Sequence, residues 1–329
     1  MVNRRFAAGF DIGGTKCAVL LGETVGQDGI RVIGKRRFAT AEFREPEMCL
    51  AEMCRLLTEL FTEHRVANGE VAGIGISCGG PLDPERGIVQ SPPNLPGWDE
   101  IPVTALVEAR TGLRAKLEND ANACALAEWR FGAGRGTSDM VFLTFGTGLG
   151  AGIIANGRLL AGRCGMAGEC GHVRLAPSGP VGYGKAGSFE GFCSGGGIAQ
   201  LGRLRAETAL NAGKPLPWCP AAADLPLVNA KVIADAAESG DADALAVYRE
   251  SGRRLGEGLS ILIDILNPEC IVIGSIFARS EHLLRPEMER VIASEALPQS
   301  ARVCRIVPAQ LGEAIGDIAS LAVAAAPAL

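Results

Sequence analysis

Two glycine-rich turns, each directly after a short apolar run, most constrain how this chain can fold. The first turn spans residues 11–16 (Asp-Ile-Gly-Gly-Thr-Lys) and the second spans residues 144–150 (Thr-Phe-Gly-Thr-Gly-Leu-Gly). Glycines let the backbone turn sharply and bring its N–H groups close to an anion, and a threonine hydroxyl adds a further donor. Two such units in corresponding places of two half-chains predict a pair of loops that grip a polyphosphate. This pattern indicates a nucleotide-using enzyme.

The remaining sequence predicts strands that alternate with helices. We expect a strand–turn–strand unit over residues 6–21, strands over 30–38, 71–77, 115–117, 140–156 and 271–273, and helices over 46–64, 103–111, 121–131 and 242–266, with a loop-rich insertion ahead of residue 242. This alternation implies an α/β fold with mostly parallel sheets, whose ligands bind beyond the carboxyl ends of the strands. We expect one domain over residues 1–118 and a second over 119–313. The helix over 314–329 can cross back to complete the first.

The composition excludes several classes of partner. The 329 residues carry a formal net charge of −5 without a local run of basic residues, which argues against nucleic acid or an anionic membrane surface as a partner. We find neither an apolar stretch of about 18 residues that predicts a transmembrane helix nor the apolar core of a signal peptide. The 11 scattered cysteines then indicate mostly buried free thiols. We therefore expect a cytoplasmic protein.

Asp120 is the candidate catalytic residue. It follows a predicted strand and opens a predicted helix, whose N-terminus favours the ionised carboxylate. Such a carboxylate could accept the proton of a substrate hydroxyl that attacks a γ-phosphate; an ordinary helix N-cap is the competing interpretation. Side chains in other loops offer the alternating donors and acceptors that bind a sugar or polyol. These are Asn94, Asn119, Glu169, His172 and Glu190.

Motifs in this order and spacing resemble the ROK family of bacterial sugar kinases and related repressors, and the resemblance covers nearly the whole chain. It implies the two-lobed, ribonuclease H-like fold of hexokinase and actin, with a cleft between the lobes. Residues 11–16 and 146–150 resemble the two phosphate motifs of the family, 79–81 and 91–98 its sugar loops, 118–122 the segment of its catalytic base, and 267–274 its adenosine-side motif, where Ser275 replaces a usual second glycine.

The resemblance also implies a role for individual residues. Asp120 takes the place of the catalytic base. The sugar would be bound by Gly80, Asn94, Asn119, Glu169, His172 and Glu190. The nucleotide would be bound by Asp11, Gly13, Gly14, Thr15, Lys16, Gly146, Thr147, Gly148 and Gly274.

One segment departs from the family pattern. Family members usually hold a structural zinc with the histidine of a Gly-Glu-x-Gly-His segment and three cysteines of a nearby loop. In this chain Val181, Tyr183 and Ser188 stand where the thiolates belong, and none of them is a good zinc ligand. The sequence therefore argues against zinc. Our hypothesis is that packing of Val181, Tyr183 and Phe189 replaces the metal and leaves His172 and Glu190 facing the sugar.

The resemblance implies ATP-dependent phosphorylation of a hexose or hexose derivative in carbohydrate metabolism, at a primary hydroxyl, by a glucokinase-like phosphotransferase with an alcohol acceptor. Mg²⁺ would bridge the β- and γ-phosphates, with Asp11 helping to hold it, and the family predicts a homodimer. The sugar, and the choice between ATP and polyphosphate, stay open. The alternatives are a non-catalytic sugar-binding or regulatory ROK protein and a repressor. Family repressors carry a helix-turn-helix ahead of the first phosphate motif, where this chain has 10 residues.

Overall fold

Internal contacts divide the chain into two compact units in a computed structural model that describes residues 5–25 and 29–325. Unit 1 comprises Met1–Ser138, Gly152–Ala167 and Gln310–Leu329, and unit 2 comprises Asp139–Ala151 and Gly168–Ala309. The predicted boundary at residue 118 thus falls inside the first segment of unit 1. The C-terminal segment returns to unit 1, although residues 326–329 of the expected last helix lie outside the described residues.

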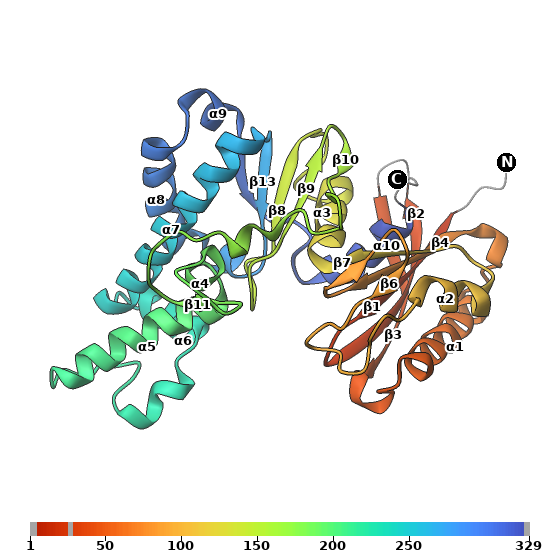
Figure 1. Ribbon diagram of the computed structural model, residues 1–329, viewed down its shortest axis with the longest axis horizontal. Coiled ribbons are helices and arrows are strands. Elements are labelled where there is room, and N and C mark those ends of the chain that lie inside the picture. The colour runs from red at the N-terminus through yellow and green to blue at the C-terminus, as the bar shows by residue number, and fades with distance from the viewer. Residues whose placement is uncertain (1–4, 26–28, 326–329) are drawn as a thin grey trace. The chain divides into compact units, whose positions relative to one another are not determined.

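A five-stranded mixed sheet forms the centre of unit 1 (Figure 1). Its strand order is β3 (Gly29–Ala39), β2 (Lys16–Val25), β1 (Phe6–Ile12), β4 (Val71–Cys78) and β7 (Ala115–Asn119). The first glycine turn joins β1 to β2 as an antiparallel pair, and β2 also pairs antiparallel with β3. The strands β1, β4 and β7 run parallel to one another. The carboxyl ends of these three strands therefore meet at one edge of the sheet.

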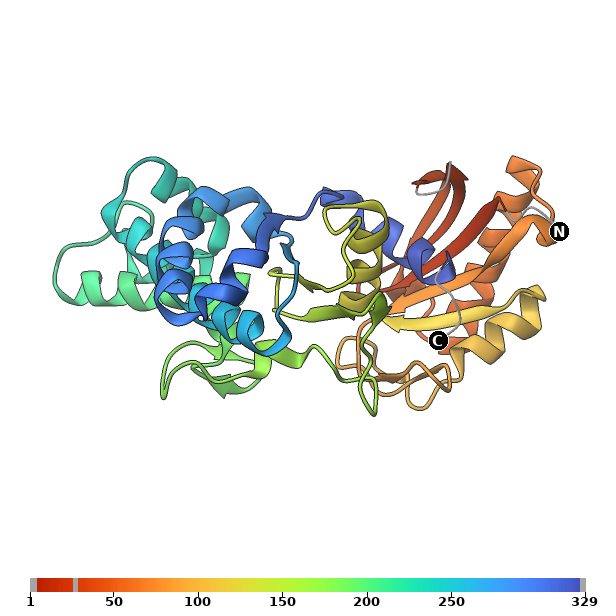
Figure 2. The same cartoon turned by 90° about the horizontal axis from the view of Figure 1, so that it is seen from above.

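Helices cover both faces of this sheet. On one face, α1 (Pro46–His64) and α2 (Val103–Thr111) bury the side chains of Phe10 and Ile12. On the other face lies α10 (Ile315–Ala325) (Figure 2). Its Leu321 packs in one apolar cluster with Leu20 of β2. The helix α3 (Asp120–Phe131) packs beside α10. Alternate residues of β1 thus serve two separate apolar layers, as the two-residue period of a strand requires.

Short elements complete unit 1. They are β5 (Leu82–Asp83), β6 (Ile88–Val89), β10 (Arg158–Leu159), η1 (Thr40–Glu42), η2 (Asn68–Glu70) and η5 (Gly312–Ala314), together with β9 (Ala151–Ala155), of which only Ala151 belongs to unit 2. The strands β5 and β6 pair as an antiparallel hairpin, and so do β9 and β10.

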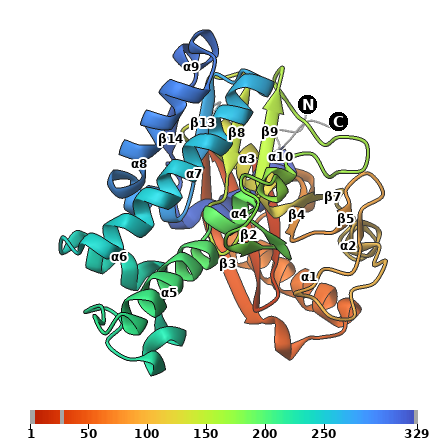
Figure 3. The same cartoon turned by 60° about the vertical axis from the view of Figure 1, so that its left-hand side comes forward.

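Unit 2 contains three parallel strands and a set of longer helices. The strand β13 (Cys270–Ile273) pairs with β8 (Met140–Leu143) on one side and β14 (Arg305–Pro308) on the other. The helices are α4 (Phe189–Phe192), α5 (Gly195–Asn211), α6 (Ala230–Glu238), α7 (Ala242–Leu266), α8 (Ile276–Glu295) and α9 (Pro298–Val303). Figure 3 shows α5 and α6 beside α7. The smaller elements are β11 (Val181–Gly182), β12 (Lys185–Ala186), η3 (Glu169–His172) and η4 (Ala222–Leu227).

The helices α5 and α6 correct the expectation of a loop-rich insertion ahead of residue 242. The first residues of α5 are three glycines at positions 195–197, and glycine is a poor helix former. Ser194 offsets this weakness because its Oγ accepts the Gly197 N–H at 3.0 Å and caps the helix.

The described helices include none that is both long and apolar enough to cross a membrane. All 11 cysteines lie in the described ranges as free thiols, and eight of them are buried, as the sequence predicted.

Candidate active site

Three strand ends bring the predicted unit 1 residues to one edge of its sheet. Ile12 at the end of β1 lies beside Cys78 at the end of β4, which in turn lies beside Asn119 at the end of β7. The segments that follow these strands are the first glycine turn, the glycine pair at residues 79–80 and the start of α3. Residues that are far apart in the sequence are thus grouped where α/β sheets bind ligands.

Hydrogen bonds from Thr40 fix the first glycine turn. The Gly13 N–H donates to the Lys16 carbonyl at 3.2 Å, while the Gly13 carbonyl accepts from Thr40 Oγ1 at 2.6 Å. The Thr40 N–H donates to the Thr15 carbonyl at 3.0 Å. Gly14 and Thr15 are exposed at the tip of the turn. The turn therefore has a fixed conformation, and its tip is open to a ligand.

Asn94 connects this turn to the predicted sugar loops. A Cβ atom added to Gly14 would lie 2.4 Å from the Asn94 carbonyl oxygen, so only glycine permits this approach. The Asn94 Nδ2 lies 3.7 Å from the place of a Cβ on Gly79, and Asn119 Nδ2 lies 3.5 Å from that on Gly80. The structure thus groups Asn94, Asn119 and the glycine pair beside the first glycine turn.

Asp120 is the first residue of α3, and its cap is supplied by Asn119. The Asn119 Oδ1 accepts the Ala121 N–H at 2.9 Å, which leaves the Nδ2 of Asn119 to act as a donor. Asp120 Oδ1 accepts the same N–H at 2.8 Å. The Asp120 side chain is accessible to solvent, yet surrounding protein atoms desolvate the carboxylate and raise its pKa. It is therefore a reachable carboxylate of raised basicity.

Glu118 supports this corner from inside the protein. Its Oε1 accepts the Asn119 N–H and the Asn122 Nδ2, both at 2.9 Å. Burial raises the pKa of Glu118. The carboxyl group fixes the backbone on both sides of the strand–helix junction, and Asp120 thereby acquires a defined position.

Asp11 lies in a cluster of charged groups that the sequence did not predict. Desolvation by burial and, after it, the nearby carboxylates of Asp317 and Asp120 together raise its pKa to about 6, against the lowering effect of Lys16 and Lys35. Lys35 forms an ion pair with Asp317 of α10. Sequence spacing could not reveal Asp317, because it reaches this edge only when the C-terminal segment returns to unit 1.

The second glycine turn follows β8 in unit 2. The Thr144 N–H donates to the Gly150 carbonyl at 3.0 Å, and the Gly150 N–H donates to Thr144 Oγ1 at 2.9 Å, so the turn is closed at its base. The Gly274 N–H donates to the Leu143 carbonyl at 2.9 Å and places the end of β13 beside the turn. Thr147 is exposed at its tip.

Two long helices begin beside this turn, and the sequence analysis predicted neither of them. The Gly195 N–H at the start of α5 donates to the Gly146 carbonyl at 2.8 Å, and the Ile276 N–H at the start of α8 donates to the Phe145 carbonyl at 3.0 Å. Helix N-termini favour anions. The Ser-Gly-Gly-Gly run at residues 194–197 was the available signal, and the sequence analysis did not use it.

The predicted sugar ligands of unit 2 lie on η3 and α4, which are in contact. Glu190 Oε2 accepts the Leu149 N–H at 3.0 Å and lies 2.7 Å from the place of a Cβ on Gly148. This carboxylate oxygen therefore stabilises the second glycine turn through a hydrogen bond. Glu169 and His172 are exposed, and the His172 ring makes an edge contact with Tyr183 at 6.3 Å between centroids.

The loop that departs from the family zinc pattern is held by hydrogen bonds. Val181 and Tyr183 are 47% and 79% exposed, so the hypothesis that their packing replaces a metal is wrong, and only Phe189 is buried. Gln200 donates to the Val181 carbonyl at 2.9 Å and accepts the Val181 N–H at 2.8 Å. Buried Ser188 accepts the Gly191 N–H at 3.0 Å. Residues 5–25 and 29–325 contain no group of three or more His, Cys, Asp or Glu side chains that could hold a metal.

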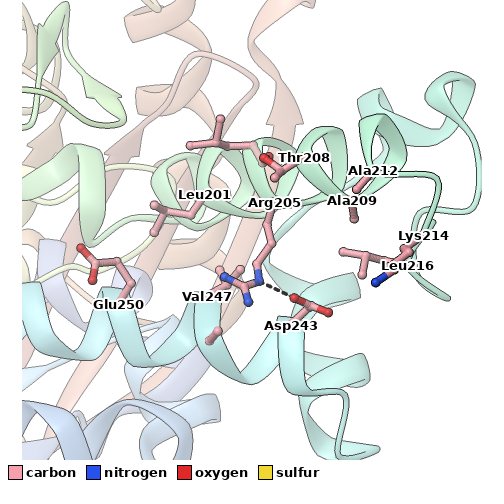
Figure 4. Close-up of a pocket in the computed structure, with 12 residues that line it drawn as sticks. Leu201, Arg205, Thr208, Ala209, Ala212, Lys214, Leu216, Asp243, Val247 and Glu250 are labelled. Atoms are coloured by element: carbon pink, nitrogen blue, oxygen red, sulfur yellow. Dashed lines mark hydrogen bonds and ion pairs between the residues drawn. The ribbon is translucent and has the colours of Figure 1, made fainter.

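A separate pocket of about 510 Å³ lies between α5 and α7 (Figure 4). Arg205 of α5 reaches Asp243 of α7 across it, with 2.6 Å between Nε and Oδ1. None of the predicted site residues lines this pocket, and most of its lining is apolar. We assign it no part in the chemistry of the glycine turns.

Comparisons with known proteins agree with the motifs. A model of the ROK family matches residues 7–326. A glucokinase from Thermotoga maritima is 34% identical over 320 residues, covering 96% of each chain. The crystal structure of a ROK family glucokinase from Streptomyces griseus in complex with glucose and AMPPNP has a TM-score of 0.71 and 31% identity, covering 96% of this chain and 98% of that chain. A ROK family transcriptional regulator, a homologue of Escherichia coli Mlc, has a TM-score of 0.80 and 26% identity, covering 97% of this chain and 77% of the regulator.

Proposed function

Since the chain belongs to the ROK family, we propose that it is an ATP-dependent kinase that phosphorylates a primary hydroxyl of a hexose or hexose derivative. The observation that carries the proposal is the edge of the unit 1 sheet. There an accessible carboxylate, Asp120, lies with the amides of Asn94 and Asn119 and with the first glycine turn.

Asp120 is the general base in this proposal. It orients the attacking hydroxyl and accepts its proton as the phosphoryl group is transferred. The raised pKa of Asp120 makes it a better proton acceptor than an ordinary aspartate. Asn119 Nδ2 and the Asn94 side chain donate to or accept from neighbouring sugar hydroxyls. Because the transition state of phosphoryl transfer is loose, this positioning supplies much of the rate enhancement.

The glycine turns hold the phosphates. Gly14, Thr15 and Thr147 present backbone N–H and hydroxyl donors at exposed tips, and in unit 2 the N-termini of α5 and α8 add positive potential. Burial and, after it, the charges of Asp317 and Asp120 raise the pKa of Asp11, and a divalent cation bound beside Asp11 would offset this negative charge. Asp11 would hold Mg²⁺, through water, and the bound ion would neutralise phosphate charge.

The unit 2 residues Glu169, His172 and Glu190 complete the sugar set in this proposal. Support comes from the exposure of the Glu169 and His172 side chains and from the contact between η3 and α4. Glu190 has one oxygen on the Leu149 N–H, so it can link sugar binding to the second glycine turn.

A coupled assay of ADP release over a panel of sugars tests the proposal. The panel contains glucose, mannose, fructose, allose, N-acetylated hexosamines and glucosides. With polyphosphate in place of ATP no ADP forms, so the phosphorylated sugar itself is measured for that donor. We expect ADP release that depends on one or a few sugars, and NMR of the product to place the phosphate on a primary oxygen. Absence of sugar-dependent turnover with every sugar and either donor would contradict the kinase.

A sugar-responsive regulator is the second candidate, because the regulator structure resembles this chain along 97% of its length. A regulator should bind sugar in calorimetry without releasing ADP. The kinase should bind sugar and also release ADP when that sugar is present. We further propose that the protein is cytoplasmic and forms a homodimer. Sedimentation of the purified protein tests the homodimer, which should have about twice the 34.2 kDa mass of one chain.

A further inference from the structure

Glu128 is a buried carboxylate on the helix that carries Asp120. It lies on α3 about two turns beyond Asp120, and its side chain is 0% exposed. Burying a carboxylate is unfavourable unless hydrogen bonds satisfy it. The groups that donate hydrogen bonds to Glu128 therefore indicate the role of this buried carboxylate.

Three backbone N–H groups donate to this carboxylate, one from the segment just after α3 and two from a segment far along the chain. Ala133 donates to Oε2 at 2.7 Å and Gln310 donates to Oε2 at 3.2 Å. Leu311 donates to Oε1 at 2.9 Å. A Cβ on Gly132 would lie 2.0 Å from Oε2, so any larger residue there would displace the Glu128 carboxylate. Hydrogen bonds to an ionised acceptor are the stronger kind.

These segments are two of the connections between the units. The first segment of unit 1 ends at Ser138, shortly after Ala133, and its last segment begins at Gln310. The Glu128 carbonyl also accepts the Gly132 and Gly134 N–H groups, at 3.1 and 3.0 Å. One residue of α3 thus fixes both the departure of the chain from unit 1 and its return.

We propose that Glu128 is a positioning residue for phosphoryl transfer. It joins the helix that carries Asp120 to the two connections, so that helix and connections form one rigid piece. Residues that fix the chain segments joining two parts of an enzyme can lie far from the reacting groups, and replacing them often changes kcat. This inference rests on the proposed kinase function.

The test compares Glu128→Gln with the wild type, using ATP and the sugar of the panel that the wild type phosphorylates fastest. The glutamine amide N–H₂ must face at least one N–H donor, so that donor loses its partner. We expect kcat to fall about 10-fold at a temperature well below unfolding. Hydrogen exchange of the peptides over residues 132–138 and 309–312 should accelerate about 10-fold.

Trp129→Phe is the matched control. Its indole N–H donates to the Thr137 carbonyl at 2.7 Å, in the same connection, without touching the carboxylate. We expect kcat within about twofold of the wild type and unchanged exchange over 309–312. If Glu128→Gln does not fold, Gln310→Pro removes one of the three donors and should lower kcat about threefold.

A purely structural role predicts that these variants lose thermal stability but keep the kcat of the wild type, and that result would overturn the inference. The two proposals fail in different ways. A wild type without sugar-dependent turnover over the whole panel contradicts the kinase, whereas an active wild type with an equally active Glu128→Gln contradicts only the role of Glu128.

Discussion

Carboxyl groups from distant parts of the sequence influence one another at one edge of the unit 1 sheet. Asp11 is the second-last residue of β1, Asp120 opens α3, and Asp317 lies in the first turn of α10. The first two were predicted because glycine turns and strand–helix junctions have recognisable sequences. Asp317 and its partner Lys35 were not, because nothing local relates them to Asp11.

Replacing Asp120 tests the general base. Asp120→Asn keeps the size of the side chain and can still accept the Ala121 N–H, so we expect a folded protein that binds sugar. Without a base, kcat should fall at least about 100-fold with little change in KM for the sugar. Steady-state kinetics measure both, with Asp235→Asn on the exposed face of α6 as control. Near-normal turnover of Asp120→Asn would exclude Asp120 as the base.

The raised pKa of Asp11 predicts a pH-dependent stability. The carboxyl has a pKa of about 6 in the folded protein against the usual 3.8, so the folded state prefers the protonated form. Stability from this group is fully present below about pH 4 and is lost as the pH rises through about 6. Asp11→Asn, which cannot ionise, should be the more stable protein above pH 6, by about 3 kcal/mol at most.

Thermal or urea unfolding of both proteins from pH 4 to pH 8, without nucleotide or metal, measures this difference. The stability gap between Asp11→Asn and the wild type should widen from pH 4 to 6 and stay constant above about 7. A gap that does not depend on pH would show that the Asp11 carboxyl titrates normally.

The elements themselves were predicted where their period is strong. The structure has α1, α2 and α7 at the bounds that the sequence predicts, and α3 begins one residue earlier, at the cap. In contrast α5 was missed, since its first turn is glycine. Tertiary packing, which the local sequence does not show, decides the structure of such segments.

The contact of α10 with β4 is the clearest example of tertiary packing. A Cβ on Gly75 of β4 would lie 2.0 Å from the Ser320 carbonyl oxygen of α10.

Gly75→Ala should therefore force α10 away from the sheet. The clash is with backbone atoms, which cannot rotate aside, so we expect a loss of at least about 3 kcal/mol in the free energy of unfolding. Gly69→Ala is the matched control, because an added Cβ there meets nothing within 4 Å; its stability should change by less than about 0.5 kcal/mol. Equal urea midpoints for the two variants would contradict this close approach.

On the scale of the whole molecule, the loop at residues 181–190 departs from the expected zinc pattern and is held by hydrogen bonds. The two hydrogen bonds of Gln200 with Val181 and the cap by Ser188 fix the loop. Only the Phe189 side chain of the expected apolar cluster is buried. A stable fold of this chain should not require a metal at this loop.

Metal removal tests this independence. We expect less than about 0.1 zinc per chain in purified protein, and a melting temperature that EDTA changes by less than about 1 °C, because no metal-linked folding energy is lost. Stoichiometric zinc, or a large drop in melting temperature on chelation, would contradict it.

The sequence by itself determined the local elements on which the proposed chemistry rests. The two glycine turns, Asp120 at a strand–helix junction and the polar loop residues are local patterns, because turn geometry and helix capping depend on neighbouring residues. The tertiary structure decided what lies beside them. The return of residues 310–325 to unit 1 brings Asp317 toward Asp11 and the Gln310 and Leu311 N–H groups to Glu128. The exposure of Val181 and Tyr183 was also decided there. Such contacts join residues that are far apart in the chain, so they form only when tertiary packing brings those residues together.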